Sequence, residues 1–191
     1  LSMIEHVISG ALNLNPNELS IVISNEMGVD VQRDLKKKYN NLYFTIQKDR
    51  LRTGHAVRVA IENSKVNSDT CLILYGDTPF IEKETLRNII DDSRESDVSV
   101  LAFESEDPAS YGRLIVDGQK LEKIVEFKDA NKKQREVKLC NSGVMAINGS
   151  KINNLLARIN NNNSSKEFYL TDIVAIAKME GLKCSFIKCN E

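Results

Sequence analysis

The sequence predicts an α/β fold in which a mixed, mostly parallel sheet is flanked by helices. Helical and strand-like segments alternate through the first half of the chain, which implies right-handed crossovers between parallel strands. In the middle, Cys71–Leu74 is a short apolar run without alternation, as expected of a strand buried on both faces. No stretch rich in Pro, Gly and Ser interrupts the chain, so we expect residues 1–191 to form a single domain.

Each segment of the first half has its own signal. The first helix is expected to begin at Ser2, because Ser2 and Glu5 have capping-box spacing and the apolar residues after them share one helical face. The central strand ends before Pro79, which cannot continue a ladder. We expect strands at 19–24, 42–47 and 71–74, and helices at 31–39, 53–63 and 83–93.

The second half contains a hairpin and two further helices. Alternating strands within 113–127 are joined at Asp117-Gly118, a strong hairpin signal. Thr171-Asp172 is read as the cap of a helix that Gly181 closes. Other strands are expected at 98–105, 141–148 and 184–189, and another helix after residue 150, so that this half continues the sheet of the first.

Composition excludes several function classes. The net charge of −1 gives no indication of nucleic acid or an anionic membrane as partner. No apolar run reaches the length of a membrane span, and no signal peptide is visible. The four cysteines are scattered, three of them in apolar strand-like runs, which favours buried thiols in a reducing cytoplasm.

Asp77 is the first candidate for chemistry. Tyr75-Gly76-Asp77 follows directly on the central strand, and ligands in open α/β sheets bind beyond the carboxyl ends of the strands. Gly76 lets the backbone approach a ligand closely. The structural alternative is an Asp that starts an ordinary turn with Thr78 and Pro79.

A second candidate group lies at the junction of a strand and a helix. The Gln47 amide can offer a donor and an acceptor to a base edge, and the Thr53-Gly54 amides at a helix start suit an anion. An ordinary strand–loop–helix junction is the alternative. For His55 and His6, packing or hydrogen bonding is favoured over a role as base, since no carboxylate partner stands beside them in the sequence.

Three more positions lie at strand ends. Gly112 could bring backbone against a ligand. The simpler explanation is that this glycine only forms the turn before the hairpin. Glu126 leaves a strand beside Lys128 and Asp129, where a carboxylate can accept hydrogen bonds from sugar hydroxyls or belong to a solvated charge cluster. Asn141 begins the strand of the Asn-Ser-Gly motif. No Ser–His–Asp or Cys–His arrangement and no glycine-rich phosphate loop can be assembled.

The order of these motifs resembles the bacterial sugar-1-phosphate nucleotidylyltransferases, and in particular the uridylyltransferase domains of bifunctional uridylyltransferase/acetyltransferases. The motifs are IQKDRLRTGHA, LYGDTPFI, DPASYGRLIVD, IVEFKDA, NSGVMAI and EFYLTDIVAIA, and they extend over nearly the whole chain. The resemblance implies a Rossmann-like fold of the nucleotide-diphospho-sugar transferase type. It implies the reaction of UTP with N-acetylglucosamine 1-phosphate to UDP-N-acetylglucosamine and pyrophosphate, with Mg²⁺, in cell-wall and lipopolysaccharide precursor synthesis.

By the same resemblance, the candidate residues fall into three groups. Uracil would be held by Gln47, Arg52 and Thr53. The junction of nucleotide and sugar would be lined by Tyr75, Gly76 and Asp77, with Asp77 as the magnesium ligand, and the acetamido sugar would contact Gly112, Glu126 and Asn141. A phosphate oxygen attacks the α-phosphorus in line, so the protein positions anions and supplies no nucleophile.

The chain also departs from the pattern of this family. The family's first strand and its phosphate-binding loop have no counterpart here, nor has the acetyltransferase half, through which the full-length homotrimer assembles. We therefore expect this piece to be inactive alone and able to exist as a monomer. Arg52 stands where the family has Gly, so its β-carbon should crowd the base or force a costly φ.

Two other functions remain open at this stage. One is a nucleotidylyltransferase for another base or sugar, because specificity rests on a few pocket residues. The other is a non-catalytic regulatory module on the same fold. A soluble α/β domain with coincidental motifs is disfavoured by six motifs in order.

Overall fold

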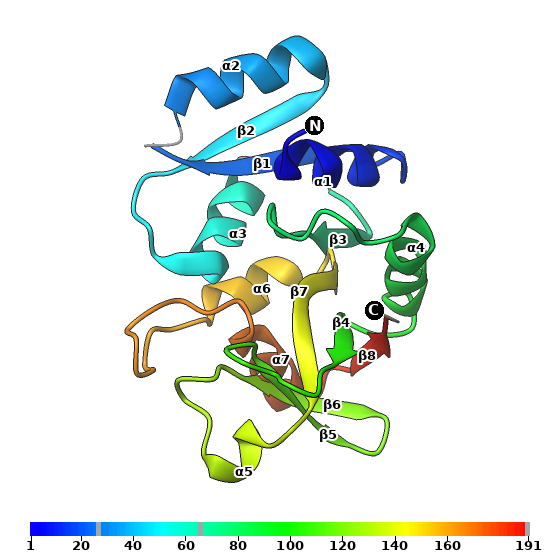
Figure 1. Ribbon diagram of the computed structural model, residues 1–191, viewed down its shortest axis with the longest axis vertical. Helices are drawn as coiled ribbons and strands as arrows, with labels where there is room; N and C mark the ends of the chain where they lie inside the picture. The colour runs from blue at the N-terminus through cyan, green and yellow to red at the C-terminus, as the bar shows by residue number, and fades with distance from the viewer. Residues whose placement is uncertain (26–27, 65–66, 190–191) are drawn as a thin grey trace.

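The computed structural model describes residues 1–25, 28–64 and 67–189, and it confirms the α/β class with a sheet and flanking helices (Figure 1). The helices are α1 (Met3–Leu12), α2 (Gly28–Lys38), α3 (Arg52–Asn63), α4 (Lys83–Asp92), α5 (Lys132–Arg135), α6 (Ile152–Ala157) and α7 (Asp172–Met179). The strands are β1 (Leu19–Ser24), β2 (Leu42–Gln47), β3 (Thr70–Ile73), β4 (Val98–Glu104), β5 (Arg113–Asp117), β6 (Lys120–Val125), β7 (Leu139–Asn148) and β8 (Cys184–Lys188).

Pairing in the larger sheet is mostly antiparallel, which corrects the expectation of a mostly parallel sheet. The order is β6-β5-β7-β4-β8, with β3 also paired to β7. The cause is β7, which runs antiparallel to β3, β4 and β5 and lies among them. Because β7 is the inverted strand, β3, β4, β5 and β8 still point in one direction.

The six-stranded sheet is covered by helices on both faces (Figure 1). On one face, Val98, Val100 and Met145 are fully buried against α6 and α7. On the other, Leu101 and Val144 pack with Leu86 and Ile89 of α4. Neighbouring residues of β4 and β7 therefore enter opposite cores, as the period of a strand requires.

A second, smaller sheet is formed by β1 and β2 in parallel, in register from Leu19–Leu42 to Ser24–Gln47. Its core lies against α1 and α2 and contains Ile8, Ile21 and Leu35. Among the residues that the structure describes, no strand pairing joins β1 to β3. The expectation that the second half continues the sheet of the first is therefore met only by β3, which pairs with β7, whereas β1 and β2 form a separate sheet.

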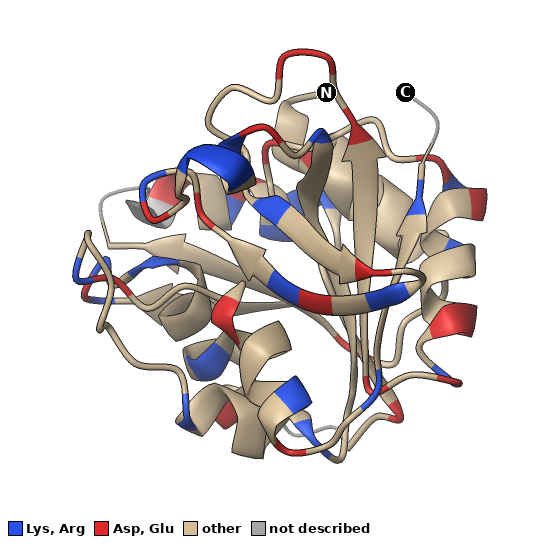
Figure 2. Cartoon of the chain, turned by 90° about the horizontal axis from the view of Figure 1, so that it is seen from below, with Lys and Arg blue, Asp and Glu red and all other residues tan. Residues whose placement is uncertain are grey.

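The surface carries both signs of charge. Lys and Arg stand among Asp and Glu on the same helices and strands in the view of Figure 2. This distribution agrees with the net charge of −1. Within the described ranges, the helices are all too short or too polar to cross a membrane.

Candidate functional site

A bulge in β7 shapes the centre of the candidate site. The pairing of β7 with β4 shifts between Val100 and Ala102, so residues 142–144 stand opposite a single residue of β4. Gly143 has φ of 89°, which favours glycine, and its N–H donates to Asn141 Oδ1 over 3.1 Å. Bulges commonly re-aim side chains beside active sites. Here the bulge opens a place for the ring of Tyr75.

Tyr75 lies directly against this glycine. A β-carbon at Gly143 would come within 2.6 Å of the Tyr75 ring, so the contact needs glycine. The Tyr75 side chain also lies near that of Thr53, at the start of α3. Burial raises the pKa of Tyr75, and the charges of Glu126 and Asp77 act in the same direction. Tyr75 thus lies near Thr53 of the group at α3 and contacts Gly143, which hydrogen-bonds Asn141 of the group around Glu126.

The group around Glu126 combines β5, β6 and the start of α7. Thr171 Oγ1 donates a hydrogen bond to Glu126 Oε1 over 2.7 Å. A β-carbon at Gly112 would stand 3.6 Å from each Glu126 carboxylate oxygen, so the bare glycine faces the carboxylate. Gly112 O in turn accepts from Asn141 N over 2.9 Å. Gly112, Glu126 and Asn141, predicted separately, therefore lie together.

Asp172 adds a second carboxylate to this group. Burial raises its pKa from 3.8 to about 6, and the charges of Glu126 and Asp129 contribute. The sequence analysis read Thr171-Asp172 as a helix cap. That reading is wrong for the Thr171 side chain, which makes no capping hydrogen bond to α7 and contacts Glu126 instead.

The group at α3 is built around Gln47, the last residue of β2. Its Nε2 donates to Arg52 O over 3.1 Å and lies 2.9 Å from His55 Nδ1. A carbonyl can only accept, so the amide nitrogen must face Arg52 O, and Gln47 Oε1 is left as the acceptor available to a ligand. His55 is thus a hydrogen-bonding residue, as expected.

Arg52 begins α3 with φ of 75°, a conformation that L-residues other than Asn and Asp rarely adopt. The expectation that a side chain here forces a costly φ is confirmed. Arg52 Nε pairs with Glu167 Oε1 over 2.7 Å. The backbone strain is therefore accompanied by an ion pair to the segment before α7.

Residues 51–54 and 167–170 are joined by several further hydrogen bonds. Phe168 N donates to Leu51 O, and Gly54 N donates to Phe168 O over 3.0 Å. Leu170 N donates to Thr53 Oγ1 over 3.3 Å. We call the hydrogen bonds between these two segments the α3–α7 contact. They hold the start of α3 against the segment that precedes Thr171.

Asp77 lies in the turn after β3, exposed and four residues beyond the last strand residue, Ile73. Among the residues that the structure describes, no Lys or Arg pairs with its carboxylate. No group of three or more His, Cys, Asp or Glu within the described ranges could hold a metal ion. Any cation at Asp77 would therefore need oxygen ligands from elsewhere, such as substrate phosphates or water.

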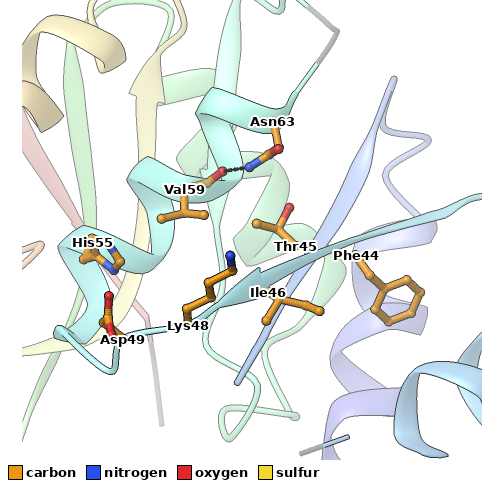
Figure 3. A pocket seen from close by; sticks show the side chains of 8 residues that line it. All are labelled: Phe44, Thr45, Ile46, Lys48, Asp49, His55, Val59 and Asn63. Atoms are coloured by element: carbon orange, nitrogen blue, oxygen red, sulfur yellow. Dashed lines mark hydrogen bonds between the residues drawn. The ribbon is translucent and has the colours of Figure 1, made fainter. Parts of the chain in front are cut away.

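A hollow of about 520 Å³ lies beside the Gln47 group, between β2 and α3 (Figure 3). Figure 3 shows Asp49 and His55 at one end and Asn63 at the other, with Lys48 between them. His55 also contacts Gln47, so the hollow adjoins the α3 group. It is lined by Phe44, Thr45, Ile46, Lys48, Asp49, His55, Val59 and Asn63.

The sequence predicted most of the site residues that follow strands, but not the residues that contact and position them. Gly143 and Thr171 stood in quoted motifs and were not counted as site residues, and Glu167 was not connected with Arg52. The glycine in Asn-Ser-Gly could have indicated close approach, since an isolated Gly within a strand often marks a bulge. The pairing of Arg52 with Glu167 joins residues far apart in the chain, and no local pattern reveals it.

Comparisons with known proteins identify the family of the chain. Residues 1–188 match the sequence model of the nucleotidyl transferase family. The bifunctional protein GlmU of Roseobacter denitrificans is 39% identical over 186 residues, which cover 97% of this chain and 41% of that protein. For GlmU of Ruegeria sp., identity is 40% over 192 residues, with 99% and 42% covered. The chain thus spans less than half the length of these curated relatives.

A solved structure shares the fold. It is assigned as a glucose-1-phosphate thymidylyltransferase from Bacillus anthracis in complex with sucrose. The TM-score is 0.78 at 16% identity, and the match covers 98% of this chain and 74% of that one.

Proposed function

This chain belongs to the nucleotidyl transferase family, and we propose that it makes UDP-N-acetylglucosamine and pyrophosphate from UTP and N-acetylglucosamine 1-phosphate. The matches to bifunctional GlmU proteins support this choice. So does the position of Tyr75, which lies near Thr53 of the group at α3 and packs against Gly143, the hydrogen-bond partner of Asn141 in the group around Glu126. We assign the nucleotide base to the first group and the sugar to the second.

The hydrogen bonds of Gln47 favour a base with an imide N–H. Its amide nitrogen is engaged by Arg52 O and His55, so Gln47 Oε1 remains to accept a hydrogen bond. Uracil and thymine carry an N–H donor at ring position N3. Cytosine has an acceptor nitrogen at N3 and could not donate to Gln47 Oε1. Thr53, at the start of α3, would lie beside the nucleotide.

In the proposed sugar group, Glu126 accepts hydrogen bonds from sugar hydroxyls, while Gly112 and Asn141 face the acetamido substituent. The phosphate oxygen of the sugar phosphate attacks the α-phosphorus of UTP, and pyrophosphate leaves. Tyr75 and Gly76 would line the junction of the two substrates. We propose that Asp77 holds Mg²⁺, which would neutralise charge on the phosphates; its exposed carboxylate, with no cationic partner among the described residues, fits such a sparse site.

We further propose that the functional sheet contains one more strand. β1 pairs with β2 and β3 pairs with β7, so β1 and β3 each present an unpaired edge within the described residues. Unpaired edges invite another strand, and one strand between them would unite the two sheets. A phosphate-binding loop following that strand would complete the triphosphate site.

The cellular setting follows from the same proposal. Cys71, Cys140 and Cys184 are free thiols, which fits a cytoplasmic enzyme. The GlmU relatives are more than twice as long as the chain, and we propose a homotrimer assembled through the additional part.

Pyrophosphate release by the full-length enzyme tests the function. We expect the highest kcat/KM with UTP and N-acetylglucosamine 1-phosphate in a panel of nucleoside triphosphates and sugar phosphates, and no turnover by residues 1–191 alone. Asp77→Asn should lower Mg²⁺-dependent kcat by about a hundredfold. Asp34→Asn, on the exposed face of α2, is the matched control. If no substrate pair releases pyrophosphate, the chain is a non-catalytic module.

A second candidate is a thymidylyltransferase. Thymine carries the same imide N–H as uracil, so Gln47 Oε1 would accept from either base. The same panel separates them, because a preference for dTTP over UTP would assign the chain to this alternative.

A further inference from the structure

Thr171 precedes α7 at a position where threonine normally caps a helix. A capping threonine accepts a hydrogen bond from an N–H group in the first turn. Thr171 makes no such bond. Its backbone is instead helical, with φ of −60° and ψ of −23°.

The first N–H groups of α7 are satisfied by the backbone. Asp172 N donates to Tyr169 O over 3.3 Å, Ile173 N to Leu170 O over 3.0 Å, and Val174 N to Thr171 O over 3.4 Å. These tight-turn bonds satisfy donors that a cap would otherwise serve. The Thr171 hydroxyl is therefore available for another partner.

That partner is Glu126. Thr171 is buried, with 3% of its surface exposed, and its hydroxyl donates to Glu126 Oε1 over 2.7 Å. A hydrogen bond to a carboxylate is shorter and stronger than one between neutral groups. With Oε1 engaged, Oε2 has no hydrogen-bond partner among the described residues, and Gly112 presents no side chain to the carboxylate.

We propose that Thr171 is the positioning residue of the sugar site: it holds the Glu126 carboxylate in one orientation, so that the other oxygen accepts a hydrogen bond from a hexosamine hydroxyl. This inference rests on the proposed function. Its effect is on affinity for the sugar phosphate and not on the nucleotide, because Thr171 belongs to the Glu126 group.

The test uses Thr171→Val in the full-length enzyme, since valine keeps the shape and removes the donor. We expect the KM for N-acetylglucosamine 1-phosphate to rise about tenfold, with the KM for UTP changed less than twofold. Thr171→Ser restores the hydroxyl and should return the KM to within about threefold of wild type. Thr70→Val is the matched control, because Thr70 hydrogen-bonds Ser93 away from the site.

A double-mutant cycle separates positioning from a purely structural role. If Thr171 acts through Glu126, Thr171→Val should add nothing to the KM effect of Glu126→Ala. An unchanged sugar-phosphate KM in Thr171→Val, or an effect that persists in the Glu126→Ala background, overturns the inference. A wild-type enzyme that does not turn over any sugar phosphate overturns the proposed function instead.

Discussion

The two sheets differ in how completely their cores are enclosed. In the six-stranded sheet, Val98, Val100 and Ile147 are fully buried, whereas Ile21 and Ile23 of the β1–β2 sheet remain 7% and 6% exposed. Helices cover the larger sheet on both faces. The proposed sugar group is built on this larger sheet, and the proposed base group on the end of β2. One site therefore joins a tightly packed region to a less enclosed one.

Matched core substitutions should make this difference measurable. Ile147→Ala leaves a cavity between packed layers and should lower the free energy of unfolding by about 4 kcal/mol. Ile21→Ala should cost only about 2 kcal/mol, because a less enclosed site can relax or admit water. Urea unfolding of both variants gives the two values. Equal losses would mean that the two cores are equally well packed.

A smaller effect on stability is expected from the carboxylate of Asp172, on the side of the site that is built on the six-stranded sheet. Its pKa of about 6 lies above the ordinary 3.8, so the folded protein binds more protons than the unfolded chain between these values. The contribution of Asp172 to stability should therefore fall as pH rises from about 4 to 6, and it is fully lost above that interval. Asp172→Asn should remove this dependence and be more stable than wild type at pH 7.

Unfolding midpoints in urea at pH 4.5 and pH 7 measure the Asp172 effect. Asp34→Asn, a substitution of an exposed Asp on α2, should keep the wild-type pH dependence. A difference in midpoint between wild type and Asp172→Asn that is the same at pH 4.5 and pH 7 would contradict the raised pKa.

The smallest effect is expected at Arg52, on the less enclosed side. Arg52→Gly relieves the positive φ, worth about 1 kcal/mol, and loses an exposed ion pair worth about 0.5 kcal/mol. The net result should be a gain of about 0.5 kcal/mol in stability. Arg52→Ala loses the ion pair and keeps the strain, so it should be less stable than wild type. A glycine variant less stable than the alanine variant would contradict this account.

Local signals predicted most of the fold. The Asp117-Gly118 hairpin is confirmed, with β5 ending at Asp117 and Gly118 at φ of 58°. The four-residue helix α5 was not predicted, since it is shorter than the period that would reveal it. The direction of β7 also escaped prediction, because a strand buried on both faces has the same pattern in either direction.

Site residues that follow a strand end could be predicted from the sequence. Site residues that are positioned by contacts with distant parts of the chain were harder to predict. Glu126 follows directly on β6, as predicted, whereas Asn141 lies within β7, which begins two residues earlier, at Leu139; the structure brings both together with Gly112. The Thr171 side chain was misread because capping is a local rule, whereas backbone carbonyls satisfied the helix and left the hydroxyl to a distant carboxylate. The strain at Arg52 was foreseen from the resemblance, because Arg stands at a position where that family has Gly.

The α3–α7 contact has a consequence for the order of folding. It joins Thr53 to Leu170 across 117 positions of the chain, so this corner cannot form until residue 170 has been synthesised. Contacts between such distant positions carry a large loop-closure entropy and form late. During translation, the start of α3 should therefore remain without this partner until residue 170 has left the ribosome, and the two groups of the proposed site should come together only after that point.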